Sequence, residues 1–142
     1  MKNYNLIFDG YWREVNKQYI SEGCGVYLIY TCRYLTEHDT VSLSQLIYIG
    51  KADNLKQRIA NHSEKEFQKV LKTGETLCYA YALVDKKELN LVENALIFAE
   101  KPQCNTKLKD EYSYEDAHFL IEGTCNLMKY TNYSITTRKD KQ

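Results

Sequence analysis

Five side chains in this sequence of 142 residues have the types and spacing needed for chemistry on a phosphate group. They are Tyr27, Tyr48, Arg58, His62 and Glu93. Within a helix, Arg58 and His62 stand four residues apart and therefore share one face. A guanidinium presents a fork of donors that matches phosphate oxygens, and an imidazole adds a further donor or a proton. The pair predicts a phosphate clamp, and a solvated helix face is the alternative.

The glutamate and the two tyrosines each have a chemical and a structural interpretation. Glu93 borders the apolar stripe of a predicted helix, where a carboxylate is costly unless it is exposed, paired or bound to metal. Tyr27 and Tyr48 fall in two predicted strands, so their hydroxyls could meet at one face of a sheet. A phenol with a pKa of about 10 is a poor base alone, but a nearby cation or metal-bound water lets it pass a proton. A solvent-facing glutamate and cross-strand packing of the tyrosines are the alternatives.

Short runs rich in β-branched and aromatic residues position the two tyrosines. Residues 25–32 and residues 45–50 have the composition of strands, and the second run ends on a glycine. We expect the two to pair as a hairpin. The polar stretch 33–44 between them would then be an insertion loop that contacts substrate or is simply exposed to solvent. A third strand is predicted over residues 77–84.

A helix is expected to begin after the second strand and to present the arginine and the histidine. Asp53 or Asn54 is the predicted N-cap, and Leu55 and Ile59 fall on one side. Residues 64–72 form a second predicted helical piece, which ends before a glycine.

The longest predicted helix covers residues 86–100 and carries Glu93. Asp85 caps its start and Pro102 enforces its end. Its apolar stripe consists of Leu89, Val92, Leu96 and Ala99. The carboxylate therefore lies at the margin of the face that packs on the sheet.

The irregular alternation of strands and helices predicts an α+β fold with a small central antiparallel or mixed β-sheet flanked by helices. Residues 118–123 and 132–137 predict two more strands around a short helical turn, and the residues near Asp140 are expected to fray. Residues 23–28, GCGVYL, do not begin a dinucleotide-binding fold, because the third glycine is missing and the glycines precede the strand.

The composition is that of one ordinary globular domain. With 44% apolar and 27% charged residues, the chain is predicted to form a single domain over residues 1–142. The 19 basic and 19 acidic side chains balance, so binding of a polyanion would need a local basic surface. Five scattered cysteines without a C-x-x-C pair are expected to be reduced and mostly buried. No membrane-length apolar run or signal peptide is found, so we expect a cytoplasmic protein without membrane contact.

The order and spacing of these residues resemble the GIY-YIG nuclease superfamily. Residues 25–27, GVY, stand where that family has its first triplet, and residues 48–50, YIG, match the second. Residues 51–59, KADNLKQRI, are similar to the family's strand-to-helix segment with its arginine, here Arg58.

The similarity continues through the second predicted helix. The stretch around Glu93, followed by Pro102 and Asn105, is similar to the family's acidic helix and its P-x-x-N ending. The resemblance covers residues 23–105, and it implies a GIY-YIG nuclease fold with N- and C-terminal extensions.

The resemblance implies metal-dependent hydrolysis of DNA phosphodiester bonds, with a role for each residue. Glu93 would be the single protein carboxylate on one divalent ion, Mg²⁺ or Mn²⁺. Tyr27 would help to take a proton from the attacking water, supported by Lys51 or His62. Arg58 and the metal would stabilise the charge that grows on the phosphorane.

Further positions would orient the site or bind substrate. Tyr48 and Asn105 would orient the site by hydrogen bonds, and Asn105 is counted with Lys56, Lys65 and Lys69 as substrate-binding. These lysines belong to a basic run that acidic residues interrupt, so a DNA track and an ordinary mixed-charge surface fit the sequence about equally well.

Three departures from the family pattern remove no catalytic group. Val26 replaces isoleucine in the first triplet with little change in volume. Cys104 stands where the family often has tyrosine, which weakens one packing contact. Residues 33–44 make the distance between the triplets longer than in the family's shorter members.

The expected function is therefore that of a DNA endonuclease, in repair, restriction or a mobile element. Its DNA would be intact, branched or damaged, with target choice left to the extensions, the insertion loop, a homodimer or a partner protein. A non-cutting nucleic-acid-binding module with the same fold and a purely structural or protein-interaction domain are the alternatives. The presence of all five family positions disfavours both.

Overall fold

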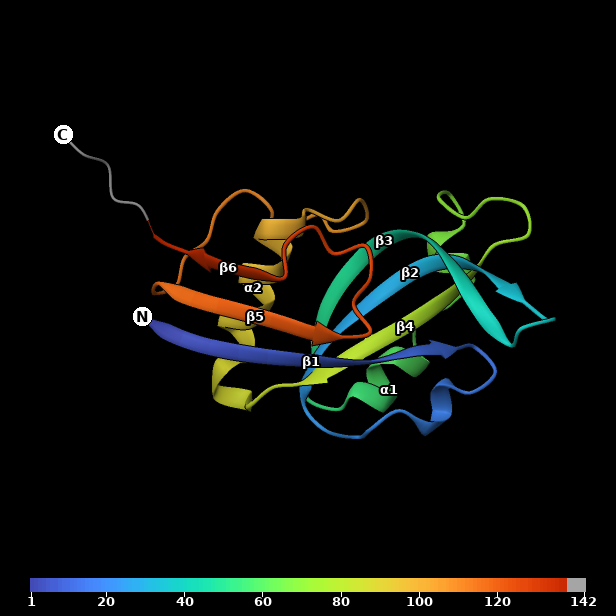
Figure 1. The fold of residues 1–142 in the computed structure, drawn as a ribbon, viewed down its shortest axis with the longest axis horizontal. Coiled ribbons are helices and arrows are strands. Elements are labelled where there is room, and N and C mark those ends of the chain that lie inside the picture. Colours follow the sequence, from blue (N-terminus) through green and yellow to red (C-terminus); the bar gives the residue numbers. More distant parts are fainter. Residues whose placement is uncertain (138–142) are drawn as a thin grey trace.

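Within residues 1–137, six strands form one curled mixed sheet in the spatial order β3-β2-β4-β1-β5-β6 (Figure 1). The computed structural model describes residues 1–137. The strands are β1 (Lys2–Arg13), β2 (Gly25–Leu35), β3 (Thr40–Ala52), β4 (Thr76–Leu83), β5 (Ala117–Gly123) and β6 (Asn132–Ile135). In the described part of the chain two α-helices accompany them, α1 (Leu55–Ala60) and α2 (Leu89–Glu100). The predicted α+β class, with a small mixed sheet flanked by helices, is confirmed.

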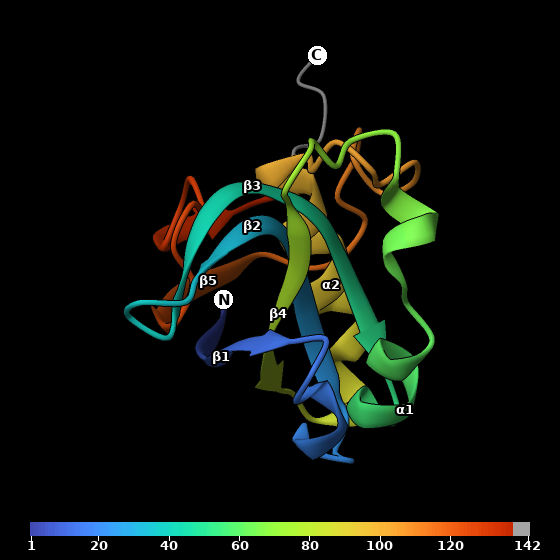
Figure 2. The ribbon, with the colours of Figure 1, turned by 90° about the vertical axis from the view of Figure 1, so that its right-hand side faces the viewer.

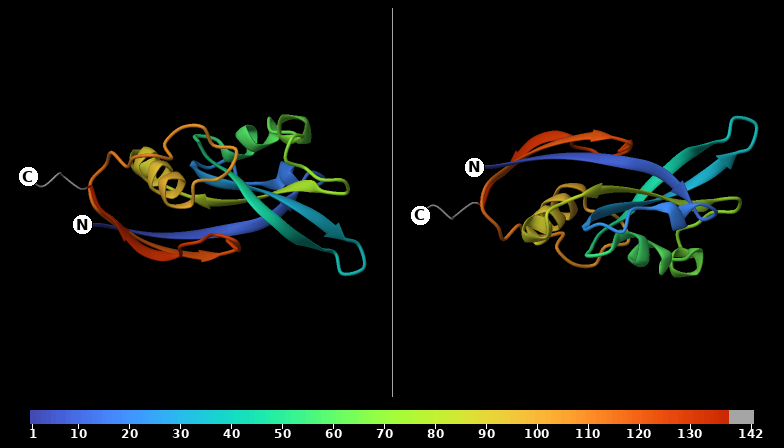
Figure 3. Two further views of the ribbon diagram at one scale, coloured as in Figure 1. Left: turned by 90° about the horizontal axis from the view of Figure 1, so that it is seen from above. Right: turned by 90° about the horizontal axis from the view of Figure 1, so that it is seen from below.

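β1 joins two parts of the sheet because it changes partner along its length. Residues 2–8 run parallel to β5, whereas residues 9–13 run antiparallel to β4 with a register shift on the way. Irregularities of this kind bend a strand and increase its twist. As a result β1, β5 and β6 pass along one side of α2, while α1 lies on the opposite side of the molecule from them (Figure 3).

β2 is buried on both faces and separates two hydrophobic clusters. Val26, Leu28 and Tyr30 belong to the cluster around α2, and Tyr27 and Ile29 belong to the cluster around α1. This follows from the alternation of side chains along a strand. The tyrosine of the first triplet therefore faces α1 and the segment that follows it.

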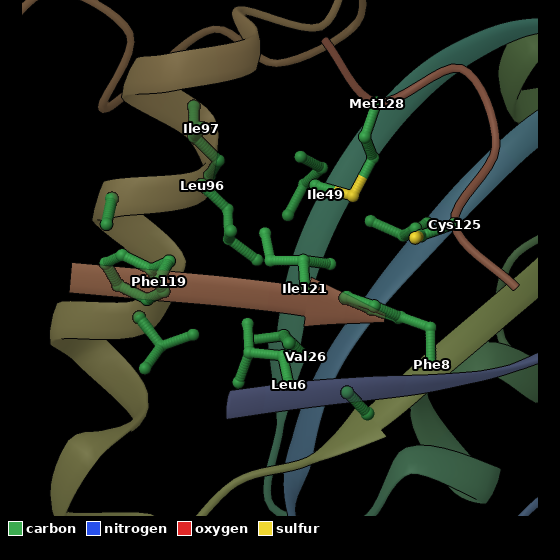
Figure 4. Packing of buried hydrophobic residues seen from close by; sticks show 14 of the residues in the cluster. Leu6, Phe8, Val26, Ile49, Leu96, Ile97, Phe119, Ile121, Cys125 and Met128 are labelled. Carbon is green, nitrogen blue, oxygen red and sulfur yellow. The ribbon is translucent and has the colours of Figure 1, made fainter. Parts of the chain in front are cut away.

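The cluster around α2 is closed by strands outside the segment that resembles the family. Leu6 and Phe8 of β1 and Phe119 and Ile121 of β5 lie against the same cluster as Leu96 (Figure 4). Each of these side chains is at most 4% exposed. Burial of one such side chain contributes roughly 1.5–3 kcal/mol. The terminal extensions are thus part of the hydrophobic core.

The two helices begin close to where the sequence places them. The side chain of Asn54, and not that of Asp53, accepts a hydrogen bond from the Gln57 backbone N–H and caps α1. The predicted helix 86–100 begins as a 3₁₀ turn, Lys86–Glu88, and becomes α-helical only from Leu89. Of the predicted apolar stripe, Leu89, Val92 and Leu96 are buried and Ala99 is half-buried.

The predicted insertion loop 33–44 is wrong, because these residues extend the hairpin. β2 and β3 stay paired as far as Leu35 and Thr40, and the tip projects away from both helices (Figure 2). Val41 and Leu43 are half-buried and alternate with exposed polar residues. This period of two is a strand signal.

Several other predicted elements also differ from the structure. The helical piece predicted over 64–72 is only a 3₁₀ turn, Glu64–Phe67. The described residues between β5 and β6 form turns without a helix, and β6 ends at Ile135 instead of 137. The strand β1 was not predicted. The tail around Asp140 lies outside the described residues.

Two expectations about the whole chain can be compared with the structure. None of the helices within residues 1–137 is long and apolar enough to cross a membrane. All five cysteines are free, with Cys32, Cys78 and Cys125 buried and the other two half-buried, as expected.

Candidate active site

Tyr27 and Tyr48 project from the same face of the β2–β3 hairpin, on the side of α1. Tyr27 pairs with Gly50 and Ile29 pairs with Tyr48, so the two phenols are diagonal neighbours. Their ring centroids are 6.2 Å apart. A Cβ atom at Gly50 would lie 2.5 Å from the Tyr27 hydroxyl oxygen. The glycine of the second triplet therefore makes room for the tyrosine of the first.

Arg58 and His62 meet at the Tyr27 hydroxyl, although only Arg58 lies within α1. His62 Nε2 is 2.7 Å from Tyr27 Oη, and Arg58 Nε donates to the same oxygen at 3.4 Å. His62 is 8% exposed and packs against the rings of Tyr48 and Phe67. Tyr27 is fully buried whereas Arg58 is exposed. The guanidinium thus covers the phenol.

Glu93 faces a cavity of about 390 Å³ that Arg58 also lines. Glu93 Oε1 is 3.9 Å from Lys51 Nζ, and the Glu93 side chain is 14% exposed. Lys51 Nζ also donates a hydrogen bond to the Asn90 side chain. The complete lining consists of Lys51, Ala52, Asp53, Arg58, Lys86, Leu89, Asn90 and Glu93. Tyr27, Tyr48 and His62 stand behind Arg58 and do not line this cavity.

The environment favours the neutral forms of the acidic groups. Burial raises the pKa of the Glu93 carboxyl, and the charges of Lys51 and Arg58 partly offset this. Burial also raises the pKa of Tyr27, and the hydrogen bond from Arg58 only partly offsets this. Burial raises the pKa of Tyr48 too, and the positive charge of Arg58 only partly offsets this. Both phenols are therefore protonated at neutral pH, and a phenol that is to accept a proton must first find an acceptor for its own.

Asn105 supports the second triplet from the edge of the sheet. The Ile49 backbone N–H donates to Asn105 Oδ1 at 3.0 Å, and Asn105 Nδ2 donates to the Ile49 carbonyl oxygen at 2.9 Å. Asn105 is 6% exposed. Both polar atoms of the Asn105 side chain are thus bonded to the strand backbone. This suits a role in orienting the site more than a role in binding substrate.

The three lysines predicted to bind substrate lie outside the cavity. Lys56 Nζ is 3.9 Å from Glu22 Oε2. Lys65 and Lys69 are exposed on the segment that follows α1. None of the three lines the Glu93 cavity, whereas Lys86, which was not predicted, does.

Sequence reasoning also missed the direct partners of the predicted residues. Glu66 Oε1 is 2.8 Å from His62 Nδ1, and Asn90 is bonded to Lys51. Glu66 follows His62 by four residues and Asn90 precedes Glu93 by three. These are one-turn spacings of the kind that drew attention to Arg58 and His62.

A lysine outside the segment that resembles the family holds the backbone beneath His62. Lys17 Nζ donates to the carbonyl oxygens of Ile59 at 3.2 Å and His62 at 2.8 Å. It also pairs with Glu14 at 2.9 Å, and its side chain is 12% exposed. The 3₁₀ turn Lys17–Tyr19 thereby ties the N-terminal segment to the end of α1.

Glu93 has the properties of a ligand for a hard cation. Within residues 1–137 no group of three His, Cys, Asp or Glu side chains is arranged to hold a metal, so protein ligands for an ion here would be few. Lys51 lies beyond hydrogen-bond distance of the Glu93 carboxylate, and burial disfavours the negative charge of that carboxylate. Mg²⁺ commonly keeps several waters and takes only one or two carboxylates. The carboxylate and the polar cavity beside it fit such an ion.

The α+β fold has the two triplets on the neighbouring strands β2 and β3, beside the helix α2 that carries Glu93. This arrangement defines a class of nuclease domain. The family model of the GIY-YIG catalytic domain matches residues 23–109, which is more than half of the chain. The chain therefore belongs to the GIY-YIG family, and the predicted resemblance is confirmed.

Three relatives that this chain resembles carry one common name. UvrABC system protein C of Hydrogenovibrio crunogenus is 33% identical over 103 residues, 68% of this chain and 15% of that protein. The protein of the same name from Rickettsia akari is 30% identical over 122 residues, 83% of this chain and 17% of that protein. The one from Thermosipho africanus is 42% identical over 73 residues, 50% of this chain and 13% of that protein. The chain thus spans only a small part of the length of these relatives. No solved structure gives a significant match.

Proposed function

We propose that this chain is a metal-dependent DNA endonuclease that hydrolyses phosphodiester bonds with one Mg²⁺ or Mn²⁺ ion. The observation that carries the proposal is the cavity shared by Glu93 and Arg58, with the hydrogen-bonded Tyr27 and His62 directly behind Arg58. A carboxylate suits an ion, a guanidinium suits a phosphate, and a phenol–imidazole pair suits proton transfer.

The charged residues of the cavity have separate tasks in this proposal. Glu93 holds the ion, which when bound polarises the phosphate and lowers the pKa of a bound water. Arg58 and Lys51 bind phosphate oxygens and oppose the negative charge that grows in the transition state. Tyr48, close to both the Tyr27 and His62 rings, keeps these groups in place.

Tyr27 and His62 move the proton of the attacking water. The water gives its proton to Tyr27 Oη while the phenol passes its own proton to His62 Nε2, 2.7 Å away. The phenol needs this acceptor because burial raises its pKa and keeps it protonated. His62 is favoured over Lys51 as the partner of Tyr27, since Lys51 is turned to Asn90 and Glu93.

Access of water to Tyr27 requires a movement of Arg58. Tyr27 is fully buried, and Arg58 donates to its hydroxyl. A phosphate in the cavity would attract the exposed guanidinium away from the phenol and leave Tyr27 Oη facing the reacting water. The movement involves one exposed side chain and leaves the hydrophobic clusters unchanged.

The burial of Tyr27 also favours one alternative, a non-cutting module that binds nucleic acid with the same fold. If Arg58 never moves away from the Tyr27 hydroxyl, the cavity can bind a phosphate group but the protein cannot cleave the phosphodiester bond. In that case a metal ion adds little to the affinity for nucleic acid, and Glu93 is not needed for binding.

The proposed partner is DNA, intact, branched or damaged. The relatives are named as proteins of a UvrABC system, and this chain matches only a small part of each. We therefore propose that a second copy of the chain or a partner protein supplies the choice of target.

The test is incubation of plasmid and oligonucleotide DNA with the protein in Mg²⁺, Mn²⁺ or EDTA. Cleavage is expected with either ion and not with EDTA. Glu93→Ala and Tyr27→Phe should each lower the rate by at least about 100-fold, whereas Glu122→Ala, an exposed carboxylate on β5, should not. Binding without metal-dependent cleavage by the wild type would establish the alternative, and full activity of Glu93→Ala would remove the mechanism.

A further inference from the structure

Glu66 stands at the outer end of a line of hydrogen bonds that leads to Tyr27. Its Oε1 atom is 2.8 Å from His62 Nδ1, and His62 Nε2 is 2.7 Å from Tyr27 Oη. A carboxylate, an imidazole and a hydroxyl group are thus joined through both ring nitrogens. The line runs from a side chain that is 46% exposed, through the buried His62, to the fully buried Tyr27.

The chemistry of the three groups fixes the direction of these bonds. An ionised carboxylate only accepts hydrogen bonds, so the hydrogen between Glu66 and His62 must belong to Nδ1. In a neutral imidazole the other nitrogen then has a free lone pair. Nε2 is therefore an acceptor, and Tyr27 donates its hydroxyl hydrogen to it. This is the tautomer that proton transfer from Tyr27 requires.

We infer that Glu66 is a positioning residue of the nuclease site, which holds His62 in the Nδ1–H tautomer and stabilises the imidazolium that forms during cleavage. The inference rests on the proposed function. Glu66 lies within the matched segment, yet it does not line the cavity and acts only through His62.

The proton balance of the step is closed. As the water oxygen bonds to phosphorus, its proton moves to Tyr27 Oη and the phenol proton moves to His62 Nε2. The bond from phosphorus to the leaving oxygen breaks with its electron pair, and that oxygen takes a proton from solvent. The imidazolium later returns its extra proton to solvent, and neutral His62 is restored.

The other groups around His62 do not supply this function. Arg58 of α1 is a cation and opposes an imidazolium, while Tyr48 of β3 is protonated and Phe67 is apolar. Lys17 donates to the backbone carbonyl of His62 and not to its ring. Among the described residues, Glu66 is the carboxylate bonded to the ring.

The first experiment measures the tautomer without any reaction. In the full chain labelled with ¹⁵N-histidine, the ring nitrogens are observed well above the ordinary histidine pKa of about 6.5, and His62 is assigned with His62→Gln. Nδ1–H is expected in the wild type, and the Nε2–H form should gain population in Glu66→Gln. A wild-type His62 in the Nε2–H form overturns the inference whether or not the protein cuts DNA.

The second experiment compares two neighbouring carboxylates on one turn. Glu66→Gln and Glu64→Gln remove the same charge, but Glu64 bonds to Thr76 and not to His62. Glu66→Gln should lower kcat by at least about 10-fold with little change in KM. Glu66→Asp should recover part of kcat, and Glu64→Gln should behave as wild type.

The outcomes separate this inference from the proposed function. The side chain of Glu66 is 46% exposed, and glutamine can still accept the hydrogen bond from His62 Nδ1. Glu66→Gln should therefore unfold close to the wild-type temperature, and a loss of kcat measured well below that temperature cannot be ascribed to unfolding. Equal kcat for Glu66→Gln and wild type would overturn the inference while leaving the nuclease intact. A wild type that does not cut DNA removes the proposed function, and the tautomer measurement then decides the structural part alone.

Discussion

At the residue scale, the candidate site holds a carboxylate in surroundings that disfavour its charge. Glu93 is 14% exposed and has Lys51 at 3.9 Å, while burial raises its pKa. A site arranged for an ion is expected to be destabilising until the ion binds, because the protein leaves the charge incompletely paired. The stability of this domain should therefore depend on the ionisation of one glutamate.

Glu93→Gln should raise the unfolding temperature at neutral pH. Because the folded-state pKa of Glu93 is raised, the stability associated with its protonated form is present below the ordinary glutamate value of 4.5 and is lost as pH rises through the folded pKa. Glutamine keeps the neutral shape at every pH. The difference between variant and wild type in thermal unfolding without metal should therefore be largest at neutral pH and disappear in acid.

Two outcomes would contradict this account of Glu93. A destabilised Glu93→Gln at neutral pH would show that attraction to the charges of Lys51 and Arg58 outweighs burial. A stabilisation that persists unchanged into acid would show that ionisation is irrelevant to it. Glu122→Gln, an exposed carboxylate on β5, provides the matched control.

Residue spacing predicted the centre of the site better than its surroundings. The two triplets make Tyr27 and Tyr48 diagonal neighbours on the hairpin, and one-turn spacing brings Arg58 near His62, since strand and helix geometry fixes these relations locally. The burial of Tyr27 and the placement of Lys86 at the cavity depend on how α1, α2 and the hairpin meet, which spacing along the chain does not encode. Glu66 carried the same spacing signal but was hidden within a mixed-charge run.

At the element scale, the N-terminal segment supports the site from outside the matched region 23–109. β1 joins the two parts of the sheet and closes one cluster, and the turn after it brings Lys17 under the end of α1. The strand signal of β1 was present in the sequence, because Tyr4, Leu6 and Phe8 face inward and alternate with exposed residues. Its mostly polar outward residues concealed it, since this part of β1 is buried on one face only.

Lys17→Met should weaken both the fold and cleavage. The variant leaves the carbonyl oxygens of Ile59 and His62 without this donor and removes the ion pair with Glu14. Loss of a buried partner of this kind costs about 1–3 kcal/mol, and the displaced His62 should reduce kcat even where the protein is fully folded. Thermal unfolding and cleavage are measured together.

Two comparisons make the Lys17 result specific. Lys17→Arg keeps a cationic donor and should recover part of both properties, and the exposed Lys107→Met should change neither. If Lys17→Met lowers stability but, below its unfolding temperature, cuts as fast as wild type, the N-terminal turn supports the fold and does not position His62.

At the scale of the whole molecule, the balance of charge limits how DNA can be held. The chain has 19 basic and 19 acidic side chains, and exposed lysines after α1 alternate with glutamates. The cations that line the candidate cavity are Lys51, Arg58 and Lys86. Such a surface suits contact with the few phosphates around a cut and does not suit a long track, which fits the proposal that another chain supplies target choice.

Binding to a short DNA duplex in EDTA should therefore depend only moderately on salt. Each neutralised phosphate contributes a slope of about −0.9 to log K against log salt, so three cavity cations predict a slope of about −3. Lys86 is 75% exposed and lies 3.8 Å from Asp53, and Lys86→Ala should make the slope shallower by about one. Lys129→Ala, which alters a separate cavity at the other end of α2, should leave it unchanged. A wild-type slope steeper than about −6, or equal effects of the two lysines, would show that DNA follows a larger surface than the one around Glu93.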